Sequence, residues 1–558
     1  MTSNAPHFTA WLDRFFASYY AERPVNATFI GEHSHDHRLP DWSDSGCGDT
    51  VAEMVAELDA LERLPSEPLT PIEALDRRLA RGFLRIHCWE YASPLFQRGN
   101  PSLHTGEAVF ALLSLFLTDY APLQERVEAA RARMAALPLF LANARAQIRE
   151  APPEWTRRAI RECEGAIAFL GEGLSRLLGG KGSLNDRVLR SADAAARAFA
   201  DHRHFLQSDL TAGWQPPPSA GEEAFDVLLR EGHFLSESAA EVVAYARDQL
   251  ARARAQLAAS TAAAGGSEAE IAERLAAGHV TVDGYLHRYS EIWQTMRAHA
   301  AGHDLVTWPD FPLRYVPRPH WVRSSAPSLY FLFYRSPAVF ARPPVHEYLV
   351  EPIEEDLDEA EQERRLRAHN DSVIKLNHVI HHGGIGHHVQ NWHAFQAASR
   401  VGRIAAVDCA SRIAMFCGGT MAEGWACYAT DVMSETGALT ADERVAEARS
   451  RIRMCARAIV DVELHHGRMT LDDATRFYEQ TAGMAAGAAS AEAVKNSMFP
   501  GAALMYLVGT DSIHALRQAT ARRQGSDFQL RAFHDRVLSY GSVPVRLVGE
   551  LMEMSDAE

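Results

Sequence analysis

The sequence has few cysteines and no closely spaced pair of them. Its seven cysteines are spread over 558 residues and form no C-x-x-C motif. A disulfide-stabilised extracellular protein would instead carry an even and dense set. The N-terminal segment also lacks the basic residues and apolar stretch of a secretory signal peptide. We therefore expect reduced thiols and a cytoplasmic protein.

Long hydrophobic runs and an excess of basic residues are also absent. No 18 consecutive residues are all apolar, whereas a helix needs about 20 such residues to cross a bilayer. Lys and Arg number 56 against 72 Asp and Glu, which gives a formal net charge of −16. Because nucleic acids and anionic membranes attract basic surfaces, we expect neither of them as a partner.

Several common catalytic motifs are missing as well. The sequence contains no G-x-S-x-G motif, no G-x-G-x-x-G motif after a strand and no thiol-protease motif around a cysteine. The glycine run at Gly179–Gly182 lacks the preceding strand and the G-K-S/T ending of a phosphate-binding loop. This run therefore indicates a plain turn between helices.

Most of the sequence has the composition and apolar spacing of helices. Ala, Leu, Arg and Glu dominate long segments in which apolar residues recur every three or four positions. Ser191 is the expected N-cap of one of them. The sequence predicts a mainly α protein, with the clearest helices at Val51–Leu64, Pro122–Leu137, Pro153–Leu178, Ser191–Leu210 and Ser238–Ala259.

The stretch from Leu305 to Ile353 has a different composition. It is rich in Pro, Tyr, Phe and Val, and residues 328–334 alternate in the manner of a strand. We expect a small β-sheet inserted around residues 305–353. The expected organisation is an N-terminal helical region, 1–300, and a second region, 301–558, that holds the sheet and the histidine cluster. Both belong to one compact unit with a central cleft.

Six histidines lie within the 17 residues from Asn377 to His393, although the whole chain has only 26. Imidazole is the commonest protein ligand for zinc and similar metals. An exposed histidine-rich helix is the alternative, but the apolar flanking residues favour burial. The sequence thus predicts a metal site among His378, His381, His382, His387, His388 and His393.

Helical geometry limits which of these histidines can share an ion. On a regular helix His381 and His387 would be rotated by about 240° and separated by about 9 Å along the axis. Three glycines between them, at positions 383, 384 and 386, predict a break or bulge that brings the two imidazoles together. His381 and His388 are the alternative pair of ligands. A seven-residue spacing puts them on the same helix face, but it leaves two turns between their rings unless the helix is distorted.

Besides the segment His381–Gln390, further motifs are spread over nearly the full length of the sequence. They are Pro24-Val-Asn-Ala-Thr-Phe-Ile-Gly-Glu-His33, Asp36-His-Arg-Leu-Pro-Asp-Trp-Ser43, Glu423-Gly-Trp-Ala-Cys-Tyr-Ala429, Arg457-Ala-Ile-Val-Asp461, Leu464-His465, Phe499-Pro-Gly-Ala-Ala-Leu-Met-Tyr506-Leu-Val-Gly509 and Phe533-His-Asp535. With these motifs the sequence resembles the bacterial family called domain of unknown function 885, which is grouped with the zincin metallopeptidase-like proteins. The resemblance implies a large multi-helix zincin-like fold.

The resemblance also implies one divalent metal ion held by His381, His387 and Glu423, with one coordination position open. Zinc is the first expectation, and iron and manganese are the alternatives. The alternative to metal binding by Glu423 is an ion pair with an arginine such as Arg412. Either partner would offset the cost of burying a carboxylate in an apolar stretch.

His382 departs from the family pattern, which has Glu directly after the first ligand histidine. In zincins that Glu takes a proton from the metal-bound water. A neutral imidazole, with an ordinary pKa near ~6.5, can act as the base in its place. Alternatively, His382 coordinates the ion itself and turns the site into a three-histidine one.

Five more residues are expected to support the site. Arg457, Asp461 and His465 follow one another at four-residue spacing and so form a stripe on one helix. By resemblance, Asp461 orients His465, which acts on a substrate carbonyl or a metal ligand, and Tyr506 stabilises an oxyanion. A ladder of surface ion pairs and a core tyrosine are the simpler alternatives. His388 is expected to contact substrate or a metal ligand.

Three functions follow from these residues. The first is a metal-dependent hydrolase of an amide bond in a small peptide or an amino-acid conjugate, with His382, His465 and Tyr506 as catalytic residues. The second is a recruited metalloenzyme that performs a lyase, transferase or oxidative step on a small molecule. The third is a catalytically silent relative that binds a ligand. The expected partner is a small-molecule or short-peptide substrate, and the oligomeric state is open.

Overall fold

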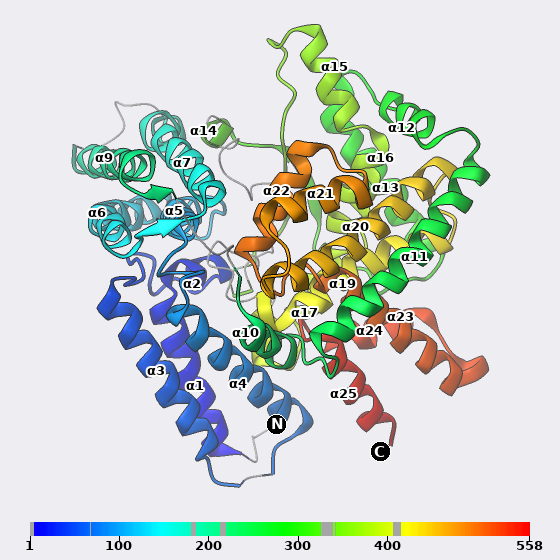
Figure 1. The fold of residues 1–558 in the computed structure, drawn as a ribbon, viewed down its shortest axis with the longest axis horizontal. Coiled ribbons are helices and arrows are strands. Elements are labelled where there is room, and N and C mark those ends of the chain that lie inside the picture. The colour runs from blue at the N-terminus through cyan, green and yellow to red at the C-terminus, as the bar shows by residue number, and fades with distance from the viewer. Residues whose placement is uncertain are drawn as a thin grey trace. The chain divides into compact units, whose positions relative to one another are not determined.

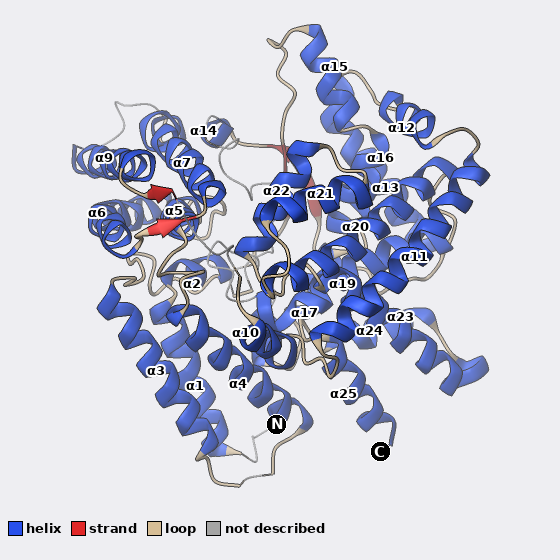
Figure 2. Ribbon diagram, in the orientation of Figure 1, coloured by secondary structure: helices blue, strands red, loops and turns tan. Residues whose placement is uncertain are grey.

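Helices dominate the part of the chain that the structure describes. The computed structural model describes residues 5–66, 68–179, 186–212, 219–323, 325, 339–340, 342–404 and 415–557. Coiled ribbons make up most of Figures 1 and 2, which confirms the mainly α fold class. The chain packs into two compact units, and each is described below by itself.

The first unit is built mainly from Met1–Ala220 and Arg318–Pro343. The three predicted helices before residue 180 are confirmed there as α3, α6 and the continuous run from α7 to α8. The elements are α1 (Pro6–Glu22), α2 (Pro24–Ile30), α3 (Asp44–Glu62), α4 (Pro71–Ala92), α5 (Pro101–Leu113), α6 (Leu123–Gln147), β1 (Glu150–Ala151), α7 (Pro153–Ala168), the π-helix η1 (Phe169–Gly173), α8 (Leu174–Leu177), α9 (Asp186–Ser208), β2 (Thr211–Ala212) and α14 (His320–Arg323).

The helix expected to start at Ser191 begins five residues earlier. Ser191 lies inside α9, and Asp186 occupies the first turn. A carboxylate there is favourable because the helix N-terminus carries partial positive charge. The expected N-cap at Ser191 is therefore wrong, although the helix itself is confirmed.

The second unit comprises Gly221–Pro317, Pro344–Ala406 and Met415–Glu558. Residues 221–300 thus pack with the region expected to hold the metal, while the central cleft stays a prediction. Its elements are α10 (Glu222–Val227), the π-helix η3 (Leu228–Gly232), α11 (Ala239–Ala264), α12 (Glu268–Ala277), α13 (Val282–Gly302), β3 (Leu313–Pro317), β4 (His346–Val350), α15 (Glu359–Ala368), α16 (Asp371–Val373), the π-helix η5 (Ile374–Gly383), α17 (His387–Ala394), α18 (Arg400–Ile404), α19 (Met415–Glu435), α20 (Ala441–His465), α21 (Leu471–Ala482), α22 (Ala486–Met498), α23 (Met505–Gln524), the 3₁₀ helix η6 (Gly525–Asp527), α24 (Leu530–Ser539) and α25 (Val545–Ala557).

Capping residues set where the long helices of this unit begin. Ser238 accepts the backbone N–H of Glu241, whose side chain returns a bond to the backbone of Ser238. Thr440 and Glu443 make the same reciprocal pair at the start of α20. Each such capping box satisfies two donors that a helix otherwise leaves without partners. The predicted helix from Ser238 is confirmed with its cap.

The small sheet expected around residues 305–353 consists of two described strands. β3 and β4 run parallel, with Leu313 opposite His346 and Pro317 opposite Val350. The alternating residues 328–334 lie outside the described residues. A second parallel pair, β1 with β2, was not expected from the sequence, since each strand is only two residues long.

Two glycines let α19 and α23 cross with their backbones in contact. A Cβ at Gly424 would overlap the backbone of Gly509, and a Cβ at Gly509 would overlap the carbonyl oxygen of Thr420. Met421, Trp425 and Tyr428 of α19 are fully buried. The crossing is next to Glu423 on α19 and within one turn of Tyr506 on α23.

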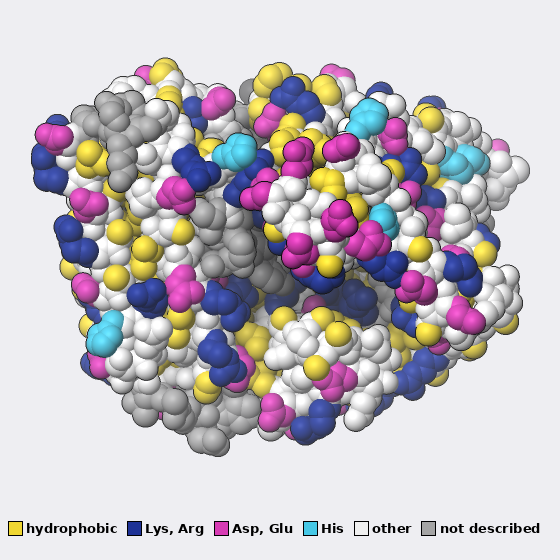
Figure 3. Space-filling model, turned by 90° about the horizontal axis from the view of Figure 1, so that it is seen from above, with side chains coloured by type: hydrophobic (Ala, Val, Ile, Leu, Met, Phe, Trp, Pro, Cys, Tyr) yellow, Lys and Arg dark blue, Asp and Glu magenta, His cyan; other side chains and the backbone are white. Residues whose placement is uncertain are grey.

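The surface shows mixed charge on the face that is visible in Figure 3, where acidic and basic side chains are interspersed. Among the described residues, no helix combines the length and the apolar character that a bilayer-spanning segment needs.

Candidate metal centre

An interruption between two helices separates His381 and His382 from His387. His381 and His382 lie near the end of η5, and α17 begins at His387 after an interruption at Gly384–Gly386. A Cβ on Gly383 would overlap the Tyr315 hydroxyl, and a Cβ on Gly386 would overlap the carbonyl group of His381. The predicted glycine-dependent break is therefore confirmed, and steric crowding is the reason that glycine is needed.

Two tryptophans hold this break in place. The indole N–H of Trp293 donates to the carbonyl oxygen of Gly383 at 2.9 Å, and that of Trp425 donates to Ile385 at 2.7 Å. Gly383 is the last residue of η5 and Ile385 lies in the interruption, where carbonyl groups are not paired by the helix itself. Since Trp425 follows Glu423 on α19, the same helix positions the break and the carboxylate.

His381, His387 and Glu423 converge on one point. The Oε2 atom of Glu423 lies 3.4 Å from Nε2 of His381 and 3.6 Å from Nε2 of His387. The two imidazole rings stand at 89° to each other with centroids 4.9 Å apart. All three side chains are less than a fifth exposed. Groups from two separate parts of the chain thus surround a small polar space.

The spacing of these atoms fits a shared metal ion. Oε2 of Glu423 is buried and has no hydrogen-bond partner in the described structure. Ligands about 2.0–2.2 Å from a tetrahedral zinc ion lie about 3.4 Å from one another. An ion pair with Arg412, the other explanation for Glu423, involves a residue outside the described part of the chain.

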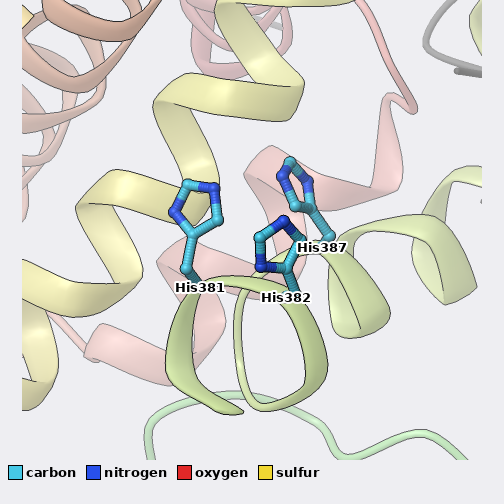
Figure 4. Close-up of side chains that lie close together, drawn as sticks. All are labelled: His381, His382 and His387. Atoms are coloured by element: carbon cyan, nitrogen blue, oxygen red, sulfur yellow. The ribbon is translucent and has the colours of Figure 1, made fainter. Parts of the chain in front are cut away.

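His382 lies next to the same space. Its ring faces those of His381 and His387 in Figure 4, and one nitrogen from each of the three lies within 4.8 Å of the others. Nδ1 of His382 is 2.6 Å from the carbonyl oxygen of Asn377. Because a carbonyl oxygen only accepts, Nδ1 carries the proton and Nε2 the lone pair. A three-histidine set is therefore available beside the two-histidine, one-carboxylate set.

The surroundings keep these groups in the protonation states that metal ligands need. Burial lowers the pKa of His381, and the neighbouring charge of His387 lowers it further. Burial and the two other imidazoles hold the pKa of His382 well below its ordinary value. Burial raises the pKa of Glu423, but the polar N–H groups and charge of the nearby His381 and His387 outweigh it and hold that pKa well below its usual value. His381 and His382 are therefore neutral and Glu423 is ionised at neutral pH.

His388 faces away from this group. Its Nε2–H donates to the carbonyl oxygen of Phe311 at 2.7 Å, and its ring stacks on Phe311. The side chain is buried, and burial lowers its pKa to about 4. Of the two adjacent histidines, the structure therefore brings His387, and not His388, to Glu423.

Arg457 and Tyr506 form a pair close to the carboxylate. The Arg457 guanidinium lies 4.6 Å from the centre of the Tyr506 ring and donates to both oxygens of Glu492, at 2.7 and 3.0 Å. Burial raises the pKa of Tyr506, and the negative charge of Glu423 raises it further. Tyr506 therefore keeps its hydroxyl proton and can act as a donor.

Asp461 and His465 anchor the segment that leads to Tyr506. Asp461 accepts the backbone N–H groups of Gly501, Ala503 and Leu504 at 2.8–2.9 Å. His465 donates from Nε2 to the carbonyl oxygen of Asn496 at 2.8 Å. Both side chains are fully buried, so these two residues do not form a surface ladder of ion pairs. The expected action of His465 on a substrate stays a prediction.

Cys427 is a neighbour of the site that the sequence motifs did not single out. Its Sγ lies 4.0 Å from Nδ1 of His381. Its position could have indicated this, because Cys427 follows Glu423 by four residues and so lies on the same face of the helix. Glu492, the partner of Arg457, was also missed, because no spacing rule connects α20 with α22.

The remaining motif residues have structural contacts. In the first unit, Thr28 donates to Asp36 at 2.6 Å and accepts from the buried Arg133 at 2.7 Å. In the second unit, the His534 ring accepts from Tyr428 at 2.8 Å, while its other nitrogen donates to Leu305 at 2.6 Å. These contacts tie distant segments together within each unit.

Comparisons with known proteins give a family and a fold. The family described as "Bacterial protein of unknown function (DUF885)" matches residues 24–552. No curated protein matches the chain. A solved structure from Shewanella oneidensis, described as "a putative lipoprotein of unknown function", is 21% identical with a TM-score of 0.76 and covers 98% of this chain and 99% of its own. A "putative lipoprotein" from Colwellia psychrerythraea is 16% identical with a TM-score of 0.79 and covers 100% of both chains.

Proposed function

We propose that this chain, which belongs to the DUF885 family of bacterial proteins, is a metal-dependent hydrolase. Its expected substrate is an amide bond in a small peptide or an amino-acid conjugate. His381, His387 and Glu423 are the proposed ligands of one divalent ion, zinc in the first instance, in a zincin-like site.

The observation that carries this proposal is the buried oxygen of Glu423. It faces two imidazole nitrogens at 3.4 and 3.6 Å without a hydrogen bond to either. Burying a carboxylate without hydrogen bonds is costly, and coordination of a cation by all three groups removes that cost. A hydrogen-bonded structural cluster would instead have shorter, aligned contacts.

The surrounding side chains supply the base and the hydrogen-bond donor that amide hydrolysis needs. When bound, a divalent ion would polarise the substrate carbonyl group and lower the pKa of a coordinated water. Nε2 of His382 accepts a proton, since Nδ1 is held by Asn377. Tyr506 donates a hydrogen bond to the oxygen that gains charge, and Arg457 positions the Tyr506 ring. Asp461 and His465 position the segment before Tyr506.

A second candidate is a non-hydrolytic metalloenzyme acting on a small molecule. The observation that favours it is His382, which stands where the family pattern has Glu and lies within ligand distance of His381 and His387. A three-histidine site, or two histidines and a carboxylate with open positions, also suits iron or manganese. The identity of the bound metal separates the two candidates.

The first experiment measures the metal content of protein purified without a histidine tag. One equivalent of zinc supports the hydrolase, whereas iron or manganese supports the second candidate. His381→Ala and Glu423→Ala are expected to lose the metal and retain helicity, and the exposed His287→Ala is the control that keeps it. Retention of the metal in both ligand variants contradicts the assignment.

The second experiment replaces the proposed base, with His382→Glu measured on a panel of short acylated peptides. Loss of a native amidase activity in this variant supports His382 as the base. Peptidase activity that is absent in the parent and appears in the variant supports the second candidate instead.

The cytoplasmic location also stays a proposal. It rests on free thiols, and Cys47, Cys88, Cys163, Cys427 and Cys455 are unpaired in the described structure. Two similar structures are described as putative lipoproteins, so fractionation of the native host cells into cytoplasm, periplasm and membrane is the decisive test.

A further inference from the structure

Three cations surround one carboxylate beside the candidate metal centre. Arg457 binds Glu492 with two hydrogen bonds. Burial raises the pKa of Glu492, but Arg457, Lys495 and Arg453 together outweigh it and lower that pKa. Glu447 also faces Arg453, and burial raises the pKa of Glu447 to about 8. The cluster therefore has three cations against two carboxyl groups, in a chain whose net charge is −16.

Arg453 and Lys495 have carboxylates nearby, Glu492 for both and Glu447 for Arg453, but are in direct contact with neither. Neither side chain forms a hydrogen bond or an ion pair within the described part of the chain. Two neighbours on α20 behave differently, since Arg449 pairs with Glu268 and Arg451 pairs with Asp511. The side chain of Arg453 is exposed, yet burial lowers its pKa, and the side chain of Lys495 is half-buried. Both side chains are therefore within reach of solvent.

This cluster adjoins the proposed catalytic groups. Arg457, one helical turn after Arg453, lies over the Tyr506 ring, and its charge acts on His381. One turn of helix spans only about 5.4 Å. A substrate bound at the metal centre can therefore extend to Arg453 within the length of a short peptide.

We infer that Arg453 and Lys495 form a subsite for a carboxylate of the substrate. A guanidinium group presents paired donors that match the two oxygens of a carboxylate, and the ammonium group adds a point charge. The substrate class then becomes peptides or acyl amino acids that end in a free carboxylate. This inference rests on the proposed hydrolase function.

The test uses N-acetyl-glycylglycine and its C-terminal amide as probes. Their binding is measured by titration calorimetry on the zinc-loaded protein and on the metal-free protein. The acid is expected to bind about tenfold more tightly than the amide, as charge-assisted hydrogen bonds imply. R453Q and K495Q each reduce this ratio toward one and leave amide binding unchanged. R476Q, which removes an exposed arginine paired with Asp473 on α21, keeps the ratio.

Equal binding of acid and amide to the parent, or a preference that survives in both R453Q and K495Q, overturns the subsite. Hydrolysis of the probes is measured in the same samples. Amide-bond cleavage without a preference for the acid means that the hydrolase stands and the subsite fails. If the parent prefers the acid, R453Q removes that preference and neither probe is cleaved, the subsite stands and the hydrolase function fails.

Discussion

His387 and His388 are adjacent in the chain but have opposite surroundings. His387 faces Glu423 at 3.6 Å, while His388 is bonded to Phe311 in a buried site. His387→Ala is expected to lower zinc affinity by at least about 100-fold, because it removes a ligand. His388→Ala is expected to destabilise the fold by about 2–4 kcal/mol and to keep the zinc stoichiometry. Chelator competition and urea unfolding of both variants measure these effects, and equal zinc loss in the two contradicts the assignment.

Glu107 in the first unit gives a prediction of a different kind. It is buried, its Oε2 lacks a hydrogen-bond partner in the described structure, and burial raises its pKa to about 8 against the opposing charge of Arg133. A carboxyl with a raised folded-state pKa stabilises the fold at low pH, and that contribution is lost as the pH rises from about 4.5 toward 8.

Glu107→Gln is therefore expected to match the parent in stability near pH 5 and to exceed it at pH 8 by about 1–3 kcal/mol. Urea unfolding at several pH values measures the difference. The exposed Glu172→Gln is the control, with a difference that does not change with pH. A constant difference for Glu107→Gln would show that its carboxyl does not titrate in this range.

At the scale of elements, the crossing of α19 and α23 connects the helix of the proposed metal ligand Glu423 with the helix of Tyr506. Gly509→Ala adds a Cβ that overlaps the carbonyl oxygen of Thr420, so the helices have to separate. We expect a loss of about 2–4 kcal/mol in stability and weaker zinc binding through displacement of Glu423. Thermal unfolding and zinc titration measure both.

Gly487→Ala on α22 is the matched control, since an added Cβ there meets nothing within 4 Å. It is expected to raise stability by about 0.5–1 kcal/mol, because alanine favours the helix more than glycine. Similar destabilisation by both substitutions would contradict the crossing argument.

The helices were more predictable than the contacts between them. α6 and α11 follow from apolar spacing, and the start of α11 from Ser238. The start of α9 was missed because Ser191 is a residue type typical of N-caps, although it lies inside the helix that begins at Asp186. Propensity decides helix interiors well, whereas a single favourable contact decides an end.

For the whole molecule, buried histidines predict how stability depends on pH. Burial is the main cause that lowers the pKa of six of them, to about 4 or about 3. They are His104, His202, His233, His378, His388 and His534. Each is neutral when folded and takes up a proton near ~6.5 when unfolded. Their contribution is therefore fully present above pH 6.5 and is lost as the pH falls from there toward about 4.

The unfolding temperature is accordingly expected to change little between pH 8 and 7 and to fall steeply between pH 6.5 and 5. Calorimetry of the metal-free protein in buffers of constant ionic strength measures this without a contribution from bound metal. A flat profile down to pH 5 would mean that these histidines titrate normally in the fold.

The sequence by itself determined the helical class and the glycine-dependent break after His382, because these depend on neighbours within a few residues. Spacing left the choice between His387 and His388 open, and the expected set of His381, His387 and Glu423 came from the family resemblance. Only the tertiary structure decided that Glu423 lies beside His381 and His387, that Asp461 holds backbone N–H groups of a distant segment, and that Arg453 forms no ion pair within the described part of the chain. These outcomes depend on how helices far apart in the chain pack, and close packing places side chains that no spacing along one helix specifies.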